Sequence, residues 1–256
     1  MVDLSTLRGC HAMFALRLRV FIDWHLAARQ AVRIVPPRDP DTAQRLADLG
    51  VASQVDPAVL PLPEPRSARD DQVLPIVAFR DHTAIEDAAQ EVVDLLHHQT
   101  DPLGSWGDAM HMAIGELCGN ALQHGANDLG AYMAADRILK PRREMRLAIA
   151  DLGIGIPEHI RTHHPEWHDD SAAISRALQR GISGTGDPHR GNGFAEVFDS
   201  AMRTDLVRSS SGADVDIRAG KGHVGVRIHG GTEIAEERRF GRPRRGTWIT
   251  YTVTTV

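Results

Sequence analysis

Residues 147–157 have the sequence LAIADLGIGIP, in which an apolar run ends at Asp151 and the alternating glycines Gly153 and Gly155 follow. The run predicts a β-strand over 145–150 that ends at the acid. Glycines let a backbone approach a ligand without a Cβ in the way. An ionised carboxylate only accepts hydrogen bonds, for example from the exocyclic amine of adenine. A plain strand-to-loop turn is the alternative, since Gly and Asp are ordinary turn residues.

An acid and an amide lie one helical turn apart earlier in the chain. Glu116 and Asn120 belong to the stretch GELCGNA at 115–121, and their i,i+4 spacing puts both side chains on one face of a helix predicted over 106–124. An amide oxygen suits Mg²⁺, and a carboxylate can orient or deprotonate a nucleophile. On its own such a pair is more typical of a solvated stripe.

A glycine-rich stretch follows the predicted strand. Residues 181–193 have the sequence GISGTGDPHRGNG and lead into an apolar-periodic helix predicted over 194–201. Free amides at a helix N-terminus can take phosphate oxygens, which gives this stretch a candidate role. The alternative is a surface loop without a ligand.

In chain order, these three elements resemble the N box and the two glycine boxes of the GHKL (Bergerat-fold) ATPase superfamily. The stretch NALQHG at 120–125 is most similar to the anti-sigma factor serine kinases and the histidine kinase-like ATPase domains. The resemblance covers roughly residues 74–256 and includes a closing strand like the one that ends such domains. Three ordered motifs are far more specific than a single glycine motif.

The resemblance implies a fold and roles for individual residues. The fold would be a two-layer α/β sandwich, with Glu116 as the general base and Asn120 as the Mg²⁺ ligand. Asp151 would contact the adenine amine, and Thr247 would assist it. His124 would lie near the phosphates, although a helix-end His also serves as a simple cap. The glycines that would shape the pocket and its lid are Gly153, Gly155, Gly184, Gly186, Gly191 and Gly193.

The remaining pattern predicts a small α/β unit at 1–52, which resembles a truncated STAS-like unit, a Pro-rich linker at 53–72 and the ATP-binding domain at 73–256. Asp41 or Thr42 is expected to cap the second helix. Helices are expected at 14–27, 43–49, 83–97, 106–124, 170–179 and 194–201. Strands are expected at 32–35, 74–79, 131–138, 145–150, 206–209, 215–219, 223–228 and 247–254, with a hairpin turn at 219–222.

The composition excludes several classes of protein. The formal net charge of −5 offers no field for nucleic acid or anionic lipid. Cys10 and Cys118 are too few for a disulfide-stapled scaffold. The chain has neither a signal-peptide pattern nor an apolar run of membrane-spanning length. We therefore expect a cytoplasmic protein that engages neither nucleic acid nor membranes.

Two basic groups have several interpretations. Five histidines lie in the predicted lid, where a metal role, a solvated surface, phosphate contact and a pH response are all open: His159, His163, His164, His168 and His189. Five arginines precede the last strand and predict either a solvated loop or a docking surface for an acidic partner: Arg238, Arg239, Arg242, Arg244 and Arg245.

These observations lead to three functional hypotheses. The first is a regulator that uses ATP and Mg²⁺ to phosphorylate Ser or Thr of a protein partner. The second is an interaction module that ATP gates, with little or no catalysis. The third is a partner-binding domain that has lost nucleotide binding. A homodimer is left open. Phe194 stands where the second glycine box more often has Leu, and this departure weakens the expectation of hydrolysis or phosphoryl transfer more than that of nucleotide binding.

Overall fold

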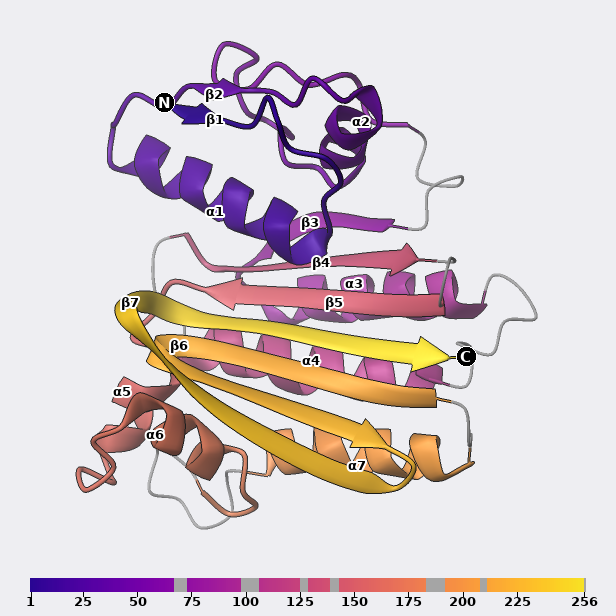
Figure 1. Ribbon diagram of the computed structural model, residues 1–256, viewed down its shortest axis with the longest axis vertical. Coiled ribbons are helices and arrows are strands. Elements are labelled where there is room, and N and C mark those ends of the chain that lie inside the picture. The colour runs from indigo at the N-terminus through magenta and orange to yellow at the C-terminus, as the bar shows by residue number, and fades with distance from the viewer. Residues whose placement is uncertain are drawn as a thin grey trace.

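The computed structural model describes residues 1–66, 73–97, 106–124, 129–138, 143–182, 192–207 and 211–255. Its centre is a five-stranded sheet in the order β3-β4-β5-β7-β6, in which every neighbouring pair is antiparallel (Figure 1). The strands are β3 (Val73–Phe79), β4 (Ala131–Ile138), β5 (Arg143–Asp151), β6 (Ser211–His229) and β7 (Thr232–Thr255).

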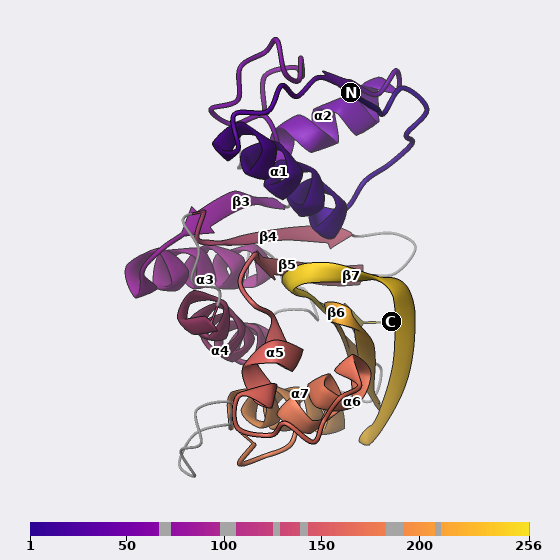
Figure 2. The ribbon, with the colours of Figure 1, turned by 90° about the vertical axis from the view of Figure 1, so that its left-hand side faces the viewer.

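Three helices cover one face of this sheet, as Figure 2 shows. They are α3 (His82–His97), α4 (Gly107–His124) and α7 (Gly193–Val207). Alternate strand residues such as Leu147 and Ile149 point toward these helices and form one core with them. The predicted two-layer α/β sandwich is confirmed.

The N-terminal unit packs on the opposite face of the sheet. It contains β1 (Val2–Asp3), α1 (Ala12–Ala27), β2 (Ile34–Val35) and α2 (Pro40–Asp48), and β1 pairs with β2 in parallel. Residues of α1 share a second core with the alternate positions of β4 and β5. Seven of the eight β4 residues are therefore buried, because the strand is covered on both faces.

Polar contacts join the N-terminal unit to β4. The Tyr132 hydroxyl donates to the Asp23 carboxylate at 3.1 Å. Arg45 of α2 donates to Asp136 at 3.1 Å, and the side chain of that aspartate is only 1% exposed. A buried carboxylate requires such a partner, because burial of an unpaired charge is costly.

The described part of the predicted linker, 53–66, lies against the N-terminal unit. Leu60 is buried, and the Ile34 amide donates to the Val59 carbonyl at 2.8 Å. Arg66 forms an ion pair with Asp48 at 2.7 Å. The division of the chain into unit, linker and domain stays a prediction.

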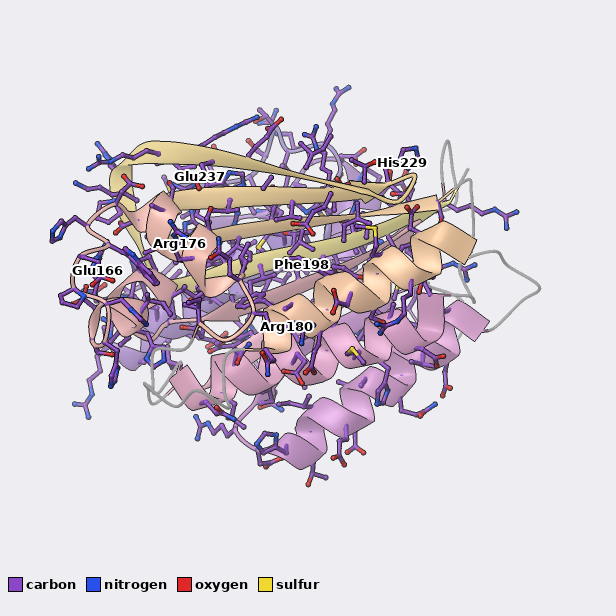
Figure 3. All side chains as sticks on the ribbon, turned by 90° about the horizontal axis from the view of Figure 1, so that it is seen from below. Glu166, Arg176, Arg180, Phe198, His229 and Glu237 are labelled. Atoms are coloured by element: carbon purple, nitrogen blue, oxygen red, sulfur yellow. The ribbon has the colours of Figure 1, made fainter. Side chains whose placement is uncertain are left out.

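The segment after β5 is tied to the β6–β7 ribbon. It contains α5 (Ile156–Arg161) and α6 (Asp170–Ala177). The Asp170 carboxylate accepts from the Arg161 guanidinium and, at 2.6 Å, from the Lys221 amide. Figure 3 shows Arg180, just beyond α6, beside α7, where it pairs with Asp199. The first part of the predicted lid is thus packed on the sheet and on α7.

The predicted hairpin turn at 219–222 is wrong. Strand β6 continues through this stretch, and its register with β7 shifts at Gly220. The turn between the two strands is at Gly230 and Gly231, which have φ angles of 59° and 70°. Both glycines adopt the left-handed backbone that tight hairpin turns require.

Three smaller predictions are corrected. The arginines at 238–245 belong to strand β7 and not to a loop. Helix α7 extends to Val207, so the strand predicted at 206–209 is wrong where it is described, and residues 208–210 lie outside the described part. The cap of α2 is Asp39, whose carboxylate accepts from the Thr42 amide at 2.9 Å, because Pro40 begins the helix earlier than expected. Within the described ranges, no helix is long and apolar enough to cross a membrane.

Candidate functional site

Asp151 is the last residue of β5 and is 4% exposed. Its Oδ1 accepts from the Gly153 amide at 2.8 Å. The amide and hydroxyl of Thr247 on β7 also donate toward this carboxyl group. Burial raises the Asp151 pKa to about 6, against the opposing effect of the Gly153 and Thr247 hydrogen bonds. Three of the predicted site residues are thus in one hydrogen-bonded group.

Glycine is required where the backbone of β7 meets the end of β5. Gly246 has φ +69°, and a Cβ there would lie 2.6 Å from the Asp151 carbonyl carbon. Gly155 has φ +82°, and a Cβ there would lie 3.0 Å from the Gly246 carbonyl oxygen. The predicted glycine Gly155 therefore allows close backbone packing beside Asp151. Gly246, which was not predicted as a site residue, also allows this close packing.

The second group joins α4 to the start of α7. Glu116 and Asn120 are half-buried on one face of α4, as their spacing predicts. Gly193 begins α7 directly against them. A Cβ on Gly193 would overlap Glu116 Oε2 and lie 3.5 Å from Asn120 Nδ2. The first and third sequence motifs, which lie far apart in the chain, are therefore neighbours in space.

Glu196 adds a second carboxylate to this group and was missed by sequence reasoning. Burial and the negative charge of Glu196 both raise the pKa of Glu116. Glu196 is three residues after Gly193 on α7, so the helical spacing from that glycine was the available signal. A carboxylate with a raised pKa is a better proton acceptor than an ordinary one.

Both groups border the layer between the sheet and its helices. Asp151 has the same parity along β5 as Leu147 and Ile149, so it points toward the helix-covered face. Thr247 has the parity of Ile249 on β7 and points the same way. Ile156, just after Gly155, packs on the core that contains the buried side of α4. The acidic strand end and the α4–α7 group therefore flank one core.

Part of the predicted site lies outside the described residues. Gly184, Gly186 and Gly191 belong to 183–191, and the side chain of His124 is not described although its backbone ends α4. Their predicted roles stay predictions.

The described histidines of the lid form local contacts. His164 stacks on Trp167 with ring centroids 4.3 Å apart. Burial and the neighbouring His163 lower the pKa of His159. In the ranges that the structure describes, no three or more His, Cys, Asp or Glu side chains cluster as metal ligands would. His189 lies outside those ranges.

Comparison of the chain with models of known protein families and with curated proteins gave no match. The function of the site is therefore inferred from its own residues.

Proposed function

We propose that this chain binds Mg-ATP between the end of β5 and the α4–α7 group and transfers its terminal phosphoryl group to Ser or Thr of a regulatory protein partner. The observation that carries the proposal is Asp151, a buried carboxylate held by Gly153 and Thr247 and facing the helix layer. The resemblance to the anti-sigma kinases supports the same reaction. We further propose that the protein acts in the cytoplasm.

The residues fit both the adenine and the metal-bound phosphates of Mg-ATP. Asp151 presents an acceptor in a dry environment, where a hydrogen bond from an amine discriminates strongly between bases. Asn120 supplies an amide oxygen of the hard type that Mg²⁺ prefers. When bound, the metal would supply positive charge that offsets the charge of the phosphates.

Glu116 would act on the hydroxyl group of the partner protein. Its carboxylate is half-buried, and its raised pKa suits it to accept a proton from that hydroxyl. Gly193 would keep the carboxylate in position, because it leaves room that any larger residue would fill. Positioning of this kind supplies a large share of the rate in phosphoryl transfer.

Calorimetric titration of ATP with Mg²⁺ into the full chain tests the binding step. Wild type should bind at one saturable site, and Asp151→Asn should lose at least tenfold in affinity, because an amide also presents donors to the adenine amine. Glu116→Gln should retain binding and abolish turnover. Absence of saturable binding by wild type would refute the proposal.

An ATP-gated interaction module is the second candidate. The packing of α5 and α6 on β6 through Asp170 favours it, because nucleotide contact with this segment would be transmitted directly to the surface of the sheet. Measurement of turnover separates the two functions. A wild type that binds ATP without any turnover or partner labelling would support the module.

A further inference from the structure

The face of the sheet opposite α4 and α7 is only partly covered. Helix α1 covers β4 and β5, but it leaves the same face of β7 and β6 open, so burial along β6 alternates. A cavity of about 500 Å³ lies at this boundary. Its floor is formed by Arg146, Thr250 and Arg218 from three adjacent strands. A volume of this size is typical of small-molecule sites.

The walls of the cavity come from both ends of the chain. His11, Met13 and Arg17 line it from the start of α1. Phe240 lines it from β7, where the register shift sets the four residues 240–243 opposite the single residue Lys221 of β6. The floor of the cavity lies on the opposite face of the sheet from the side toward which Asp151 and Thr247 point. The cavity is therefore separate from the candidate nucleotide site.

Three arginines lie in or beside this cavity without acidic partners: Arg17 and Arg218 line it, and Arg244 lies over the ring of Trp248, which also lines it. Within the described ranges, Arg17, Arg218 and Arg244 form no ion pair with a carboxylate. The Arg218 guanidinium lies 3.9 Å above the Phe240 ring, and its Nε is buried without a hydrogen-bond partner. Arg244 lies 5.0 Å above the ring of Trp248. An unsatisfied buried donor of this kind is unusual and points to a missing acceptor.

Burial and mutual repulsion both disfavour the charged forms of Arg17 and Arg244. Burial and the charges of Arg17 and Arg218 lower the pKa of Arg244 to about 10. Partial burial and the charge of Arg218 also lower the pKa of Arg17. The Asp216 carboxylate also lines the cavity, where it contacts His223 at 2.9 Å, and the nearby Glu144 pairs with Arg146. In a chain of net charge −5, a cluster of uncompensated cations is a local exception.

We propose that this cavity binds a small organic anion that carries a phosphate-type group. Arg17 and Arg218, which line the cavity, would neutralise and hydrogen-bond the anionic group, since guanidinium groups match phosphate oxygens geometrically. Arg244, beside the cavity, would add positive charge. Met13 and Phe240 would contact an apolar part of the same molecule. The bound anion would also link α1 to the β6–β7 ribbon, because its ligands come from both.

Calorimetric titration of inorganic pyrophosphate without Mg²⁺ into the full chain tests the anion site. Wild type should bind one equivalent, and Arg218→Gln/Arg244→Gln should bind at least tenfold more weakly. Arg242→Gln is the matched control, since Arg242 is exposed on the same strand and, unlike Arg244, does not stack on the lining residue Trp248. Phenyl phosphate should bind more tightly than inorganic phosphate because of the apolar wall.

Two further variants make the outcome decisive. Asn120→Ala should leave pyrophosphate binding unchanged, and loss of binding there would assign the anion to the nucleotide site and overturn the proposal. Equal affinity in wild type and the double variant would overturn it as well. If the double variant fails to fold, Arg17→Gln replaces it, because Arg17 is at an exposed position of α1. The ATP titration above is independent of all these results.

Discussion

Gly193, the first residue of α7, lies directly against the carboxyl group of Glu116 on α4. In Gly193→Ala the new Cβ would displace this carboxyl group, which is the movable end of a side chain. We expect the free energy of unfolding to change by less than about 1 kcal/mol. The rate of ATP turnover should fall about tenfold or more, because a misplaced catalytic group is costly. Denaturation and turnover assays on the same protein measure both effects.

Gly115→Ala is the control for this substitution. Gly115 is also on α4, one residue before Glu116, and a Cβ there would meet nothing within 4 Å. Alanine is favoured over glycine inside a helix by about 0.5–1 kcal/mol, so this variant should be at least as stable as wild type. Its turnover should be unchanged. Equal turnover in both variants would remove Glu116 from the mechanism.

Gly246→Ala should destabilise the whole protein. The Cβ would collide with the backbone of Asp151, which cannot move aside, and the left-handed backbone adds strain. We expect a loss of about 2–4 kcal/mol in the free energy of unfolding. Gly241→Ala on the same strand, where a Cβ meets nothing within 4 Å, should change it by less than about 0.5 kcal/mol. Urea denaturation of both variants makes the comparison.

Because of Asp151, the stability of the protein and its affinity for the ligand should change with pH in opposite directions. Its folded-state pKa of about 6 exceeds the ordinary value for an aspartate, so the folded state binds the proton more tightly. Stability from this group is therefore greatest at low pH and is lost as pH rises from about 4 to about 6. Affinity for the adenine amine should instead fall below about pH 6, where the acceptor is protonated.

Asp151→Asn isolates this effect. At pH 7.5 the variant should be more stable than wild type by up to about 2–3 kcal/mol, because it removes a buried charge. At pH 4.5 the difference should largely disappear. A difference that is constant with pH would show that the Asp151 carboxyl group titrates normally. Urea denaturation at the two pH values decides this.

Arg45→Gln should weaken the packing of the N-terminal unit on the sheet. It would leave the Asp136 carboxylate buried without its charged partner, at an expected cost of about 3 kcal/mol. Arg33→Gln, at an exposed position near the same unit, should cost less than about 0.5 kcal/mol. Thermal unfolding of both variants compares the two arginines. Equal stability would mean that Asp136 finds another partner.

Sequence patterns predicted those features that depend on neighbouring residues. The apolar alternation of 145–150 and the i,i+4 spacing of Glu116 and Asn120 gave a strand and a shared helix face, and the structure has both. The close packing of Gly246 on Asp151 and the electrostatic effect of Glu196 on Glu116 join residues far apart in the chain. The helical spacing from Gly193 was a signal for Glu196 itself, but no local pattern encodes its approach to Glu116 or the packing of Gly246 on Asp151.

The error at 219–222 has a physical cause. Buried residues occupy odd positions of β6 up to Ala219 and even positions from Val224 onward. Such a change of parity marks either a turn, where a new strand begins, or a bulge, where the same strand gains a residue. Glycine is common in both, so Gly220 did not distinguish them. The pairing of β6 with β7 continues on both sides of Gly220, so the change of parity marks a bulge.

The burial of β4 on both faces couples the stability of the N-terminal unit to that of the sheet. Loss of α1 would expose Tyr132, Ala134 and Ala148 to water together, and a sheet face of that kind invites aggregation. The two cores therefore share the strands that separate them. We expect a single cooperative melting transition, in which heat disrupts the N-terminal unit and the sheet at the same temperature.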